Sequence, residues 1–342
     1  MRASSGGKKI AVFATVAAVG AAIAVGVVLL RPRGGGGVAA VPGRGSAVQK
    51  SDWNGQPLPA WAKATDGKGF YSYPLDGTTP RYLAAVPTRR GHVAVSPDGS
   101  MLTFQRPRRI LGPGEIWVVG IDGSSLHRLT HARPEGLERN PFSPDGEQFA
   151  YVASDANGRH QIFTVDILDG TVRQLTHGGG EPMADMSWSP DGETIVLTRF
   201  LSSSAAEWHH GEESHFGLYT VDVATGRIRP LRVDAHSSNA SAMYAPGGTT
   251  LAFLHWEVGD PPTLATMGLD GGHVQMIGLD AHTGGEQWGP IWSPDGSRIA
   301  FNQRNADGIA FGYVMDLATG GTTRIPASVM GWLDQQTLVV GP

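Results

Sequence analysis

The sequence has 342 residues, of which 17% are charged and 40% hydrophobic, a balance that supports a buried core. Its 48 glycines and 23 prolines favour a turn-rich all-β protein, and the lack of cysteine excludes disulfides, cysteine–zinc sites and thiol nucleophiles. Residues 1–33 hold five basic and no acidic residues, so the rest of the chain carries a formal charge of −9. Such an acidic body would repel phosphate backbones, and we expect no nucleic-acid binding.

The first expected element is the uncharged run from Ile10 to Leu30. A helix of this length would extend about 31 Å, the thickness of a bilayer's hydrocarbon core. The basic residues before the run favour a cytoplasmic N-terminus over residues 1–9, with the remainder of the chain extracytoplasmic. We therefore expect a single-pass transmembrane anchor in the cell membrane; the alternative is a signal sequence cleaved near Ala40, which would give a secreted protein.

A segment rich in glycine and proline, residues 31–66, separates this run from the rest of the chain. It shows no sustained apolar period, so we expect a flexible tether and not a packed domain. The tether would let a domain formed by residues 67–342 stand clear of the lipid.

One tetrapeptide organises residues 67–342. Ser-Pro-Asp-Gly occurs four times and a degenerate Ala-Pro-Gly-Gly once, at spacings of 47, 46, 56 and 48 residues. Proline presets φ, aspartate accepts hydrogen bonds from nearby backbone amides, and glycine tolerates positive φ, which together favour a tight turn. We expect a structural role for the residues of these turns: Pro97, Asp98, Gly99, Pro144, Asp145, Gly146, Pro190, Asp191, Gly192, Pro294, Asp295 and Gly296.

Strands are predicted on both sides of each turn. Apolar residues lie six and eight positions after the first residue of the turn, which is the alternation of a β-strand. A second turn, Asp-Gly or Ala-Thr-Gly, follows in every unit and predicts a hairpin. Each unit therefore predicts four strands, which in the second unit lie near 140–142, 147–153, 161–167 and 171–176.

Tandem four-stranded units of this length predict a β-propeller, since one such sheet cannot bury both of its faces alone. Six second turns but only five first turns occur, and the missing half-unit is found at the C-terminus, from Met330 to Val340. We therefore expect an all-β, six-bladed propeller that forms a monomeric ring. One of its blades would be built jointly by the N- and C-terminal segments of the domain.

The repeated aromatic-Ser-Pro-Asp-Gly motif resembles the PD40 repeat, a WD40-like repeat of TolB-type propellers, over about residues 67–342. The resemblance implies a TolB-like six-bladed β-propeller. TolB itself has a separate α/β domain ahead of its propeller, whereas an anchor and a tether are expected at that place in this chain.

Histidines are the best candidates for chemistry. Connections between successive units open onto one face of a propeller, and His131, His177, His236 and His282 lie in them. With Glu286 they could bind a ligand or a divalent metal through neutral imidazoles and a carboxylate. The resemblance adds the oligogalacturonate lyases, TolB-like propellers that use a metal on the propeller face. The unequal offsets of these histidines from the next turn favour solvent-facing loop residues instead, so no cofactor is predicted and a metal stays the alternative.

An insertion of roughly ten residues lengthens one unit between Ser202 and His215. Histidine and glutamate are dense in it, but no fixed spacing places them on one face of an element. A solvated hairpin loop is favoured, and Trp208 makes contact with a partner an alternative.

Enzyme motifs are missing from the sequence: it contains no G-x-S-x-G nucleophile elbow, no P-loop and no H-E-x-x-H. A rigid ring that presents loops from every blade suits a binding platform. We therefore expect a non-enzymatic, membrane-tethered, extracytoplasmic propeller that binds an envelope protein or a surface ligand. The alternative is a metal-dependent lyase or hydrolase that uses the histidine-bearing face.

Overall fold

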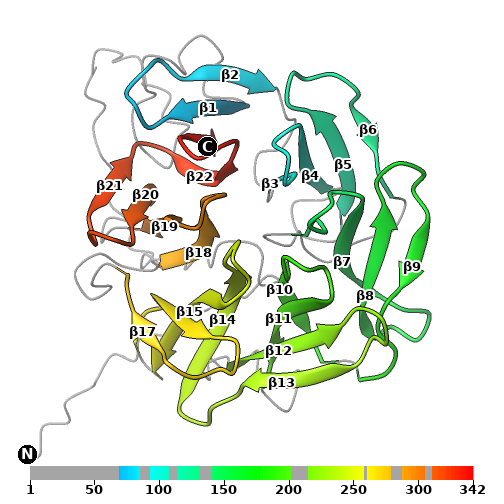
Figure 1. Ribbon diagram of the computed structural model, residues 1–342. Helices are drawn as coiled ribbons and strands as arrows, with labels where there is room; N and C mark the ends of the chain where they lie inside the picture. The colour runs from blue at the N-terminus through cyan, green and yellow to red at the C-terminus, as the bar shows by residue number, and fades with distance from the viewer. Residues whose placement is uncertain are drawn as a thin grey trace, which may run out of the picture.

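The computed structural model describes residues 69–84, 93–107, 114–130, 141–179, 181–201, 215–257, 260–278, 287–304 and 310–341. Within these ranges the regular elements are β-strands, arranged as six sheets around a central axis (Figure 1). None of the described residues forms a helix long and apolar enough to cross a membrane. The predicted anchor and tether lie outside the described ranges and stay predictions.

Each sheet is one blade, and successive strands pair antiparallel from the central axis outward. Blade 1 comprises β3 (Val93–Val95), β4 (Met101–Pro107), β5 (Gly114–Gly120) and β6 (His127–Arg128). Blade 2 comprises β7 (Gln148–Ser154), β8 (His160–Asp166) and β9 (Val172–Gln174). Blade 3 comprises β10 (Met183–Trp188), β11 (Thr194–Phe200), β12 (Phe216–Asp222) and β13 (Ile228–Arg232). Blade 4 comprises β14 (Ser237–Tyr244), β15 (Thr250–Glu257), β16 (Thr263–Gly268) and β17 (Gln275–Met276). Blade 5 comprises β18 (Gln287–Trp292), β19 (Arg298–Arg304), β20 (Ala310–Asp316) and β21 (Thr322–Ile325).

The second unit shows how closely the repeat predicts its strands. β7, β8 and β9 lie within three residues of the predicted bounds. Among the described residues, its innermost strand is reduced to one bridge between Phe142 and Phe149.

The sixth blade closes the ring with strands from both ends of the domain. Its order is β22 (Ser328–Trp332), β23 (Thr337–Gly341), β1 (Phe70–Pro74) and β2 (Arg81–Ala84). β23 pairs antiparallel with β1, from Tyr71 opposite Val340 to Pro74 opposite Thr337. The predicted joint blade, and with it the count of six, is confirmed.

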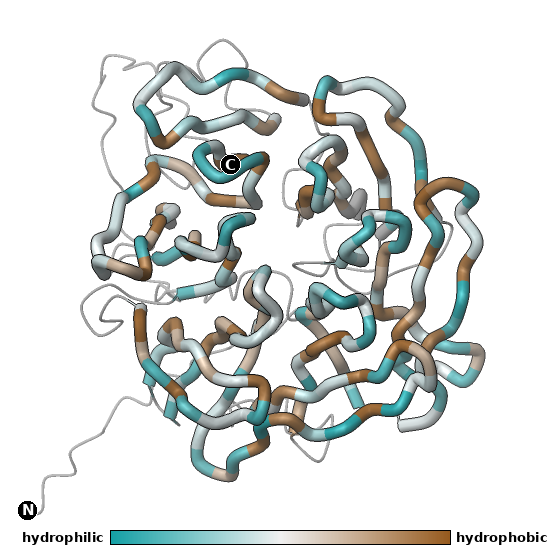
Figure 2. Tube along the Cα trace, viewed as in Figure 1, coloured by the Kyte–Doolittle hydropathy of each residue, from teal (hydrophilic) through white to brown (hydrophobic). Residues whose placement is uncertain are grey.

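The hydrophobic core lies between neighbouring blades. Figure 2 shows hydrophobic stretches along the strands, and an inner strand is buried on both faces: Phe149 and Tyr151 of β7 belong to one cluster, and Ala150 and Val152 to another. Leu251 and Phe253 of blade 4, for example, share a buried cluster with Val196 and Leu218 of blade 3. Leu251 and Phe253 lie six and eight positions after the first residue of their turn, so the period-two pattern predicts this buried face.

In four blades, an aromatic residue at the end of the innermost strand joins the blade to the preceding one. The indole nitrogens of three such tryptophans donate to a backbone carbonyl of the preceding blade's innermost segment. A tyrosine hydroxyl reaches the preceding blade in the fourth case. The pairs are Trp188 with Pro141 (3.0 Å), Trp292 with Met243 (3.1 Å), Trp332 with Ile291 (3.1 Å) and Tyr244 with Thr194 (3.1 Å).

Candidate functional site

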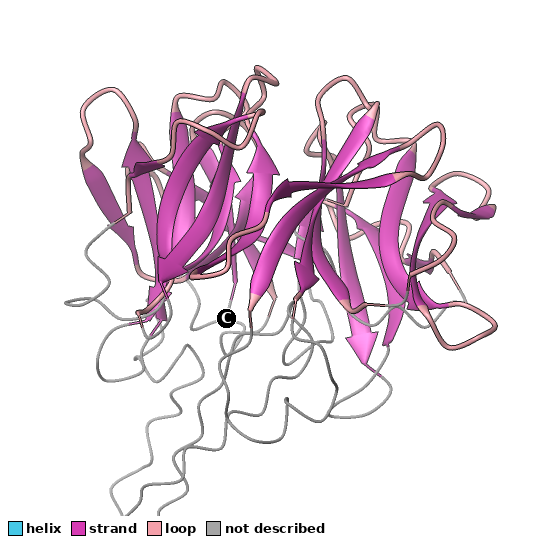
Figure 3. Cartoon of the chain, turned by 90° about the horizontal axis from the view of Figure 1, so that it is seen from below, coloured by secondary structure: helices cyan, strands magenta, loops and turns pink. Residues whose placement is uncertain are grey.

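The ring has two different faces. The turn face carries the tetrapeptide turns between the first and second strands of the blades; the connection face, opposite, is where the innermost strands begin. In the side view of Figure 3, most of the described loops gather on one side of the strands. Because all blades are wound in the same sense, each face receives the same kind of loop from every blade.

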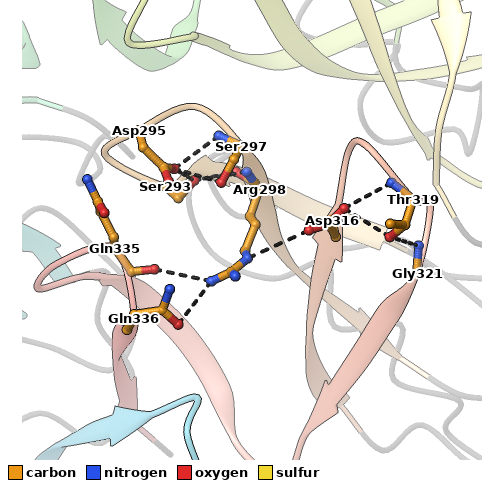
Figure 4. A network of polar contacts seen from close by, with 9 residues as sticks. All are labelled: Ser293, Asp295, Ser297, Arg298, Asp316, Thr319, Gly321, Gln335 and Gln336. Carbon is orange, nitrogen blue, oxygen red and sulfur yellow. Dashed lines mark hydrogen bonds and ion pairs between the residues drawn. The ribbon is translucent and has the colours of Figure 1, made fainter.

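The turn face uses its carboxylates to hold its own turns. In blade 5, Asp295 Oδ1 accepts hydrogen bonds from Ser293 Oγ (2.7 Å), the Ser297 amide (3.0 Å) and Ser297 Oγ (2.9 Å) (Figure 4). The hydrogen bond from Ser293 is the largest cause that lowers the pKa of Asp295. The turns of Asp98, Asp145 and Asp191 repeat this serine–aspartate bond and this pKa shift.

A second contact on this face ties blade 5 to the closing blade. Arg298 Nη1 donates to Gln335 O and to Gln336 Oε1, each at 3.3 Å, and Arg298 Nε lies 4.0 Å from Asp316 Oδ2 (Figure 4). Asp316 in turn accepts from the amide and hydroxyl of Thr319 within its own hairpin turn. The polar groups of this region are therefore engaged in structural contacts.

Two of the predicted histidines can be placed, and both lie on the connection face. His177 is exposed beside Gly178, whose carbonyl accepts from Gln161 Nε2 at the beginning of β8 (3.2 Å). His236 is exposed directly before β14, and its amide donates to Asp234 Oδ1 (2.9 Å). This hydrogen bond is the largest cause that lowers the pKa of Asp234.

The other predicted site residues, His131, His282 and Glu286, lie outside the described residues. Among the described residues, no group of three or more histidines, aspartates and glutamates is placed to hold a metal ion. Ligand or metal binding by the predicted set therefore stays a prediction.

The structure adds a polar cluster that the sequence reasoning missed. Asn239 Oδ1, on β14, accepts from Arg232 Nε (3.1 Å) and lies 2.9 Å from His255 Nδ1. Since arginine can only donate, the Asn239 atom between them is the oxygen, and we assign the Nδ1 proton of His255 to this bond. Burial, followed by the charge of Arg232, lowers the pKa of His255, so its imidazole is neutral near pH 7.

The second ring nitrogen of His255 lies beside the Glu257 carboxylate. Nε2 of the neutral ring carries a lone pair and lies 3.6 Å from Glu257 Oε1. It can accept a hydrogen bond or a proton from a ligand at the connection-face end of β15. One sequence signal could have found it: the tenth residue after the start of the turn is polar in four of five units.

An aromatic group flanks the cluster at the junction of blades 3 and 4. Phe200, Phe216 and Ala240 are buried together, with the partly exposed Trp256 packed against them. His215, the last residue of the predicted insertion, has its Nε2 atom 2.8 Å from Ser237 O. The connection face thus combines aromatic and polar side chains at its best-described junction.

Comparisons with known proteins agree with this fold. Residues 74–207 match the family model described as the TolB beta propeller domain. No curated protein matches the chain by sequence.

Solved structures show the same architecture at low sequence identity. A putative TolB from Agrobacterium tumefaciens is 18% identical with a TM-score of 0.62, covering 79% of this chain and 96% of its own. TolB from Acinetobacter baumannii is 20% identical with a TM-score of 0.57, covering 80% of this chain and 65% of its own. An oligogalacturonate lyase in complex with manganese is 20% identical with a TM-score of 0.53, covering 73% and 70%. The chain therefore forms a six-bladed β-propeller that is similar in fold to the propeller of TolB, and its residues 74–207 match the PD40 family model.

Proposed function

We propose that this protein is a non-enzymatic binding platform, tethered to the outer side of the cell membrane, whose connection face takes an envelope protein or surface ligand. One observation carries the choice of face. The turn-face carboxylates accept hydrogen bonds from their own turns, whereas His177 and His236 project into solvent on the connection face. Side chains that make no structural contact within the fold can bind a partner.

The composition of the connection face supports this role. At the junction of blades 3 and 4, Trp256 and His255 are partly exposed beside the exposed Glu257. Aromatic groups combined with adaptable polar ones are typical of binding surfaces on rigid scaffolds. The first strand of the propeller also begins on this face, because Phe70 starts β1 at the connection-face end of the closing blade. A tether joined there would keep this face towards the membrane and its proteins.

Site-specific photo-crosslinking tests the proposal on the full chain in native envelope vesicles. A photoreactive residue at His177 or His236 should give adducts with one defined partner. The matched control places the same residue at Ala224, which is exposed in the outer hairpin turn of blade 3. Adducts from Ala224 alone, or equally from all three positions, would overturn the choice of the connection face.

Membrane tethering is tested separately by N-terminal sequencing of the protein from the membrane fraction. We expect a chain that retains residues 10–30. A chain that begins near Ala40 would contradict the anchor and identify a secreted propeller.

A metal-dependent lyase or hydrolase is the second candidate function. The observation that favours it is the lone pair of His255 Nε2 beside the Glu257 carboxylate on the histidine-bearing face. Elemental analysis of the purified protein, before and after dialysis against a chelator, distinguishes the two. A stoichiometric divalent metal that His255→Ala removes would favour the enzyme; a metal-free protein that still crosslinks its partner would favour the platform.

A further inference from the structure

Four of the six junctions between blades carry a polar contact directly before the first turn of the later blade. The indole N–H groups of Trp188, Trp292 and Trp332 each donate to a backbone carbonyl of the preceding blade. The hydroxyl of Tyr244 lies 3.1 Å from Thr194 Oγ1 of the preceding blade. These contacts join blades 2, 3, 4, 5 and the closing blade into one continuous arc (Figure 1).

Blade 1 lies outside this arc. The residue directly before the turn is Val95 in blade 1 and Phe142 in blade 2, and both belong to the described part of the chain. Neither side chain has an N–H or O–H group, so neither can donate a hydrogen bond to the preceding blade. Blade 1 therefore has this polar contact at neither of its two junctions.

The turn of blade 1 meets the closing blade through backbone atoms. Gly99 has a φ of +71°, and a Cβ atom at this position would lie 2.8 Å from Leu333 O. A side chain does not fit there, so none can bridge the two blades at this point. At the junction of blade 5 with the closing blade, in contrast, Arg298 donates to Gln335 O and Gln336 Oε1.

Apolar packing holds blade 1 against both of its neighbours. Leu102 and Phe104 share a buried cluster with Val339 of the closing blade, and Val118 shares another with Phe149 of blade 2. Apolar contacts are non-directional, whereas a hydrogen bond requires a defined distance and angle. The turn-face end of blade 1 is therefore held in place without a directional contact from the position that joins the other blades.

The junction of blades 3 and 4 has the opposite character. The Ser241 amide donates to Thr198 Oγ1 (3.0 Å), and Ser241 Oγ donates to Asp185 Oδ2 (2.7 Å). Together with the contact between Tyr244 and Thr194, these bonds fix the orientation of the two blades. The ring thus has a side with several directional contacts and a side, around blade 1, that relies on apolar packing.

We propose that blade 1 is the movable blade of the ring. Its turn-face end separates from the closing blade and from blade 2, while the arc formed by the other five blades stays joined. Local opening of this kind costs less free energy than global unfolding and occurs in contiguous structural units. The inference concerns the conformation of the ring, and it does not depend on which face binds a partner.

Hydrogen–deuterium exchange of the full chain in detergent micelles, measured by mass spectrometry of its peptides, tests the proposal. We expect the amides of β4 and β5 in blade 1 to exchange about tenfold faster than those of β15 and β16 in blade 4. Equal protection of the two pairs of strands would overturn the proposal.

Two reciprocal substitutions test the cause. Phe142→Trp supplies an indole N–H at the junction of blades 1 and 2, where Ala94 O occupies the place that Met243 O has in the next such contact. We expect exchange in β4 and β5 to slow by about fivefold. Trp292→Phe is the matched reverse substitution, because it removes the bond to Met243 O, and it should speed exchange in β19 and β20 by a similar factor.

The outcomes that contradict the proposal are distinct. Unchanged exchange in blade 1 of Phe142→Trp, together with faster exchange in blade 5 of Trp292→Phe, would show that the missing indole does not set the motion of blade 1. An equal change in every blade would show a global effect and not local opening. Phe142 is buried against Phe149, so Phe142→Trp can disturb packing. Trp292→Phe then decides alone, and wild-type protection of its blade 5 would overturn the proposal.

Discussion

The turn face and the connection face are built from the same strands, yet they use their side chains in opposite ways. On the turn face, four aspartates of the repeat make the same bond to a serine two residues earlier. On the connection face, the best-described group is the His255 cluster of blade 4, at a position where the other units carry arginine, alanine or glutamine. Repetition marks the residues that build the ring, and departure from it marks the residues available to a partner.

Removal of the closing strands should have the largest effect, because it destroys the ring on which both faces depend. A stop after Ala327 deletes β22 and β23, including the buried Trp332, Leu338, Val339 and Val340. Burial of such side chains stabilises a fold by about 1.5–3 kcal/mol each, against a typical total of about 5–15 kcal/mol. We expect an insoluble protein or one without a cooperative thermal transition. A melting temperature equal to that of the intact chain would contradict the closure between β1 and β23.

The next effect concerns contacts between blades at the turn face. Trp292→Phe keeps the ring but removes the N–H that donates to Met243 O. The carbonyl then loses its donor at a partly buried site, which should destabilise the protein by about 1–3 kcal/mol. Trp288→Phe at the connection-face end of the same strand is the matched control for a lost indole. Chemical denaturation gives the free energy of unfolding of both variants. A larger decrease for Trp288→Phe than for Trp292→Phe would contradict the structural role assigned to the turn face.

A carboxylate on each face gives a smaller and more direct comparison. Asp295→Ala removes an acceptor of three hydrogen bonds. Because the carboxylate is screened by solvent, we expect the free energy of unfolding to fall by about 1 kcal/mol at pH 7. Asp234→Ala removes the acceptor of the His236 amide and should have a smaller effect. Denaturant titration at neutral pH measures the free energy of unfolding of both variants. An equal decrease in the two would contradict this prediction.

The pH dependence of the Asp295 effect has a fixed sign. The folded pKa of Asp295 lies below its unfolded value, so its contribution is fully present above the unfolded pKa of about 3.9. The contribution disappears as the pH falls through the folded pKa. The difference between wild type and Asp295→Ala should therefore shrink below pH 4, and a constant difference would refute the assigned cause.

The smallest expected effect is the titration of His255 on the connection face. Its folded pKa lies below the unfolded value of about 6.5, so the unfolded chain binds this proton more readily. The contribution to stability is present above pH 6.5 and is lost as the pH falls from there towards the folded pKa. His255→Gln should remove this part of the pH dependence, with His177→Gln as the control. NMR titration of the ring would contradict the assignment if its pKa were 6.5 or higher.

The sequence by itself determined the architecture. The tetrapeptide, the alternation of apolar residues and the count of turns sufficed for six blades and for the joint blade made by β1 and β23. These features are local, since a turn and a strand face depend on residues a few positions apart, so they can be read along the chain. The position of His236, directly before an innermost strand, followed from the same assignment of strands relative to the turns.

Only the tertiary structure decided which side chains meet between and within blades. The indole of Trp292 donates to a carbonyl 49 residues away in the sequence. Asn239, His255 and Arg232 come from three different strands and form one cluster. Arg304 lies over the ring of Trp288, which belongs to the neighbouring strand. Contacts of this kind depend on the twist of each sheet and on how neighbouring blades pack, which no local pattern encodes. The repeat therefore predicts where each residue lies in its blade, while the packing of the ring decides which partner it has.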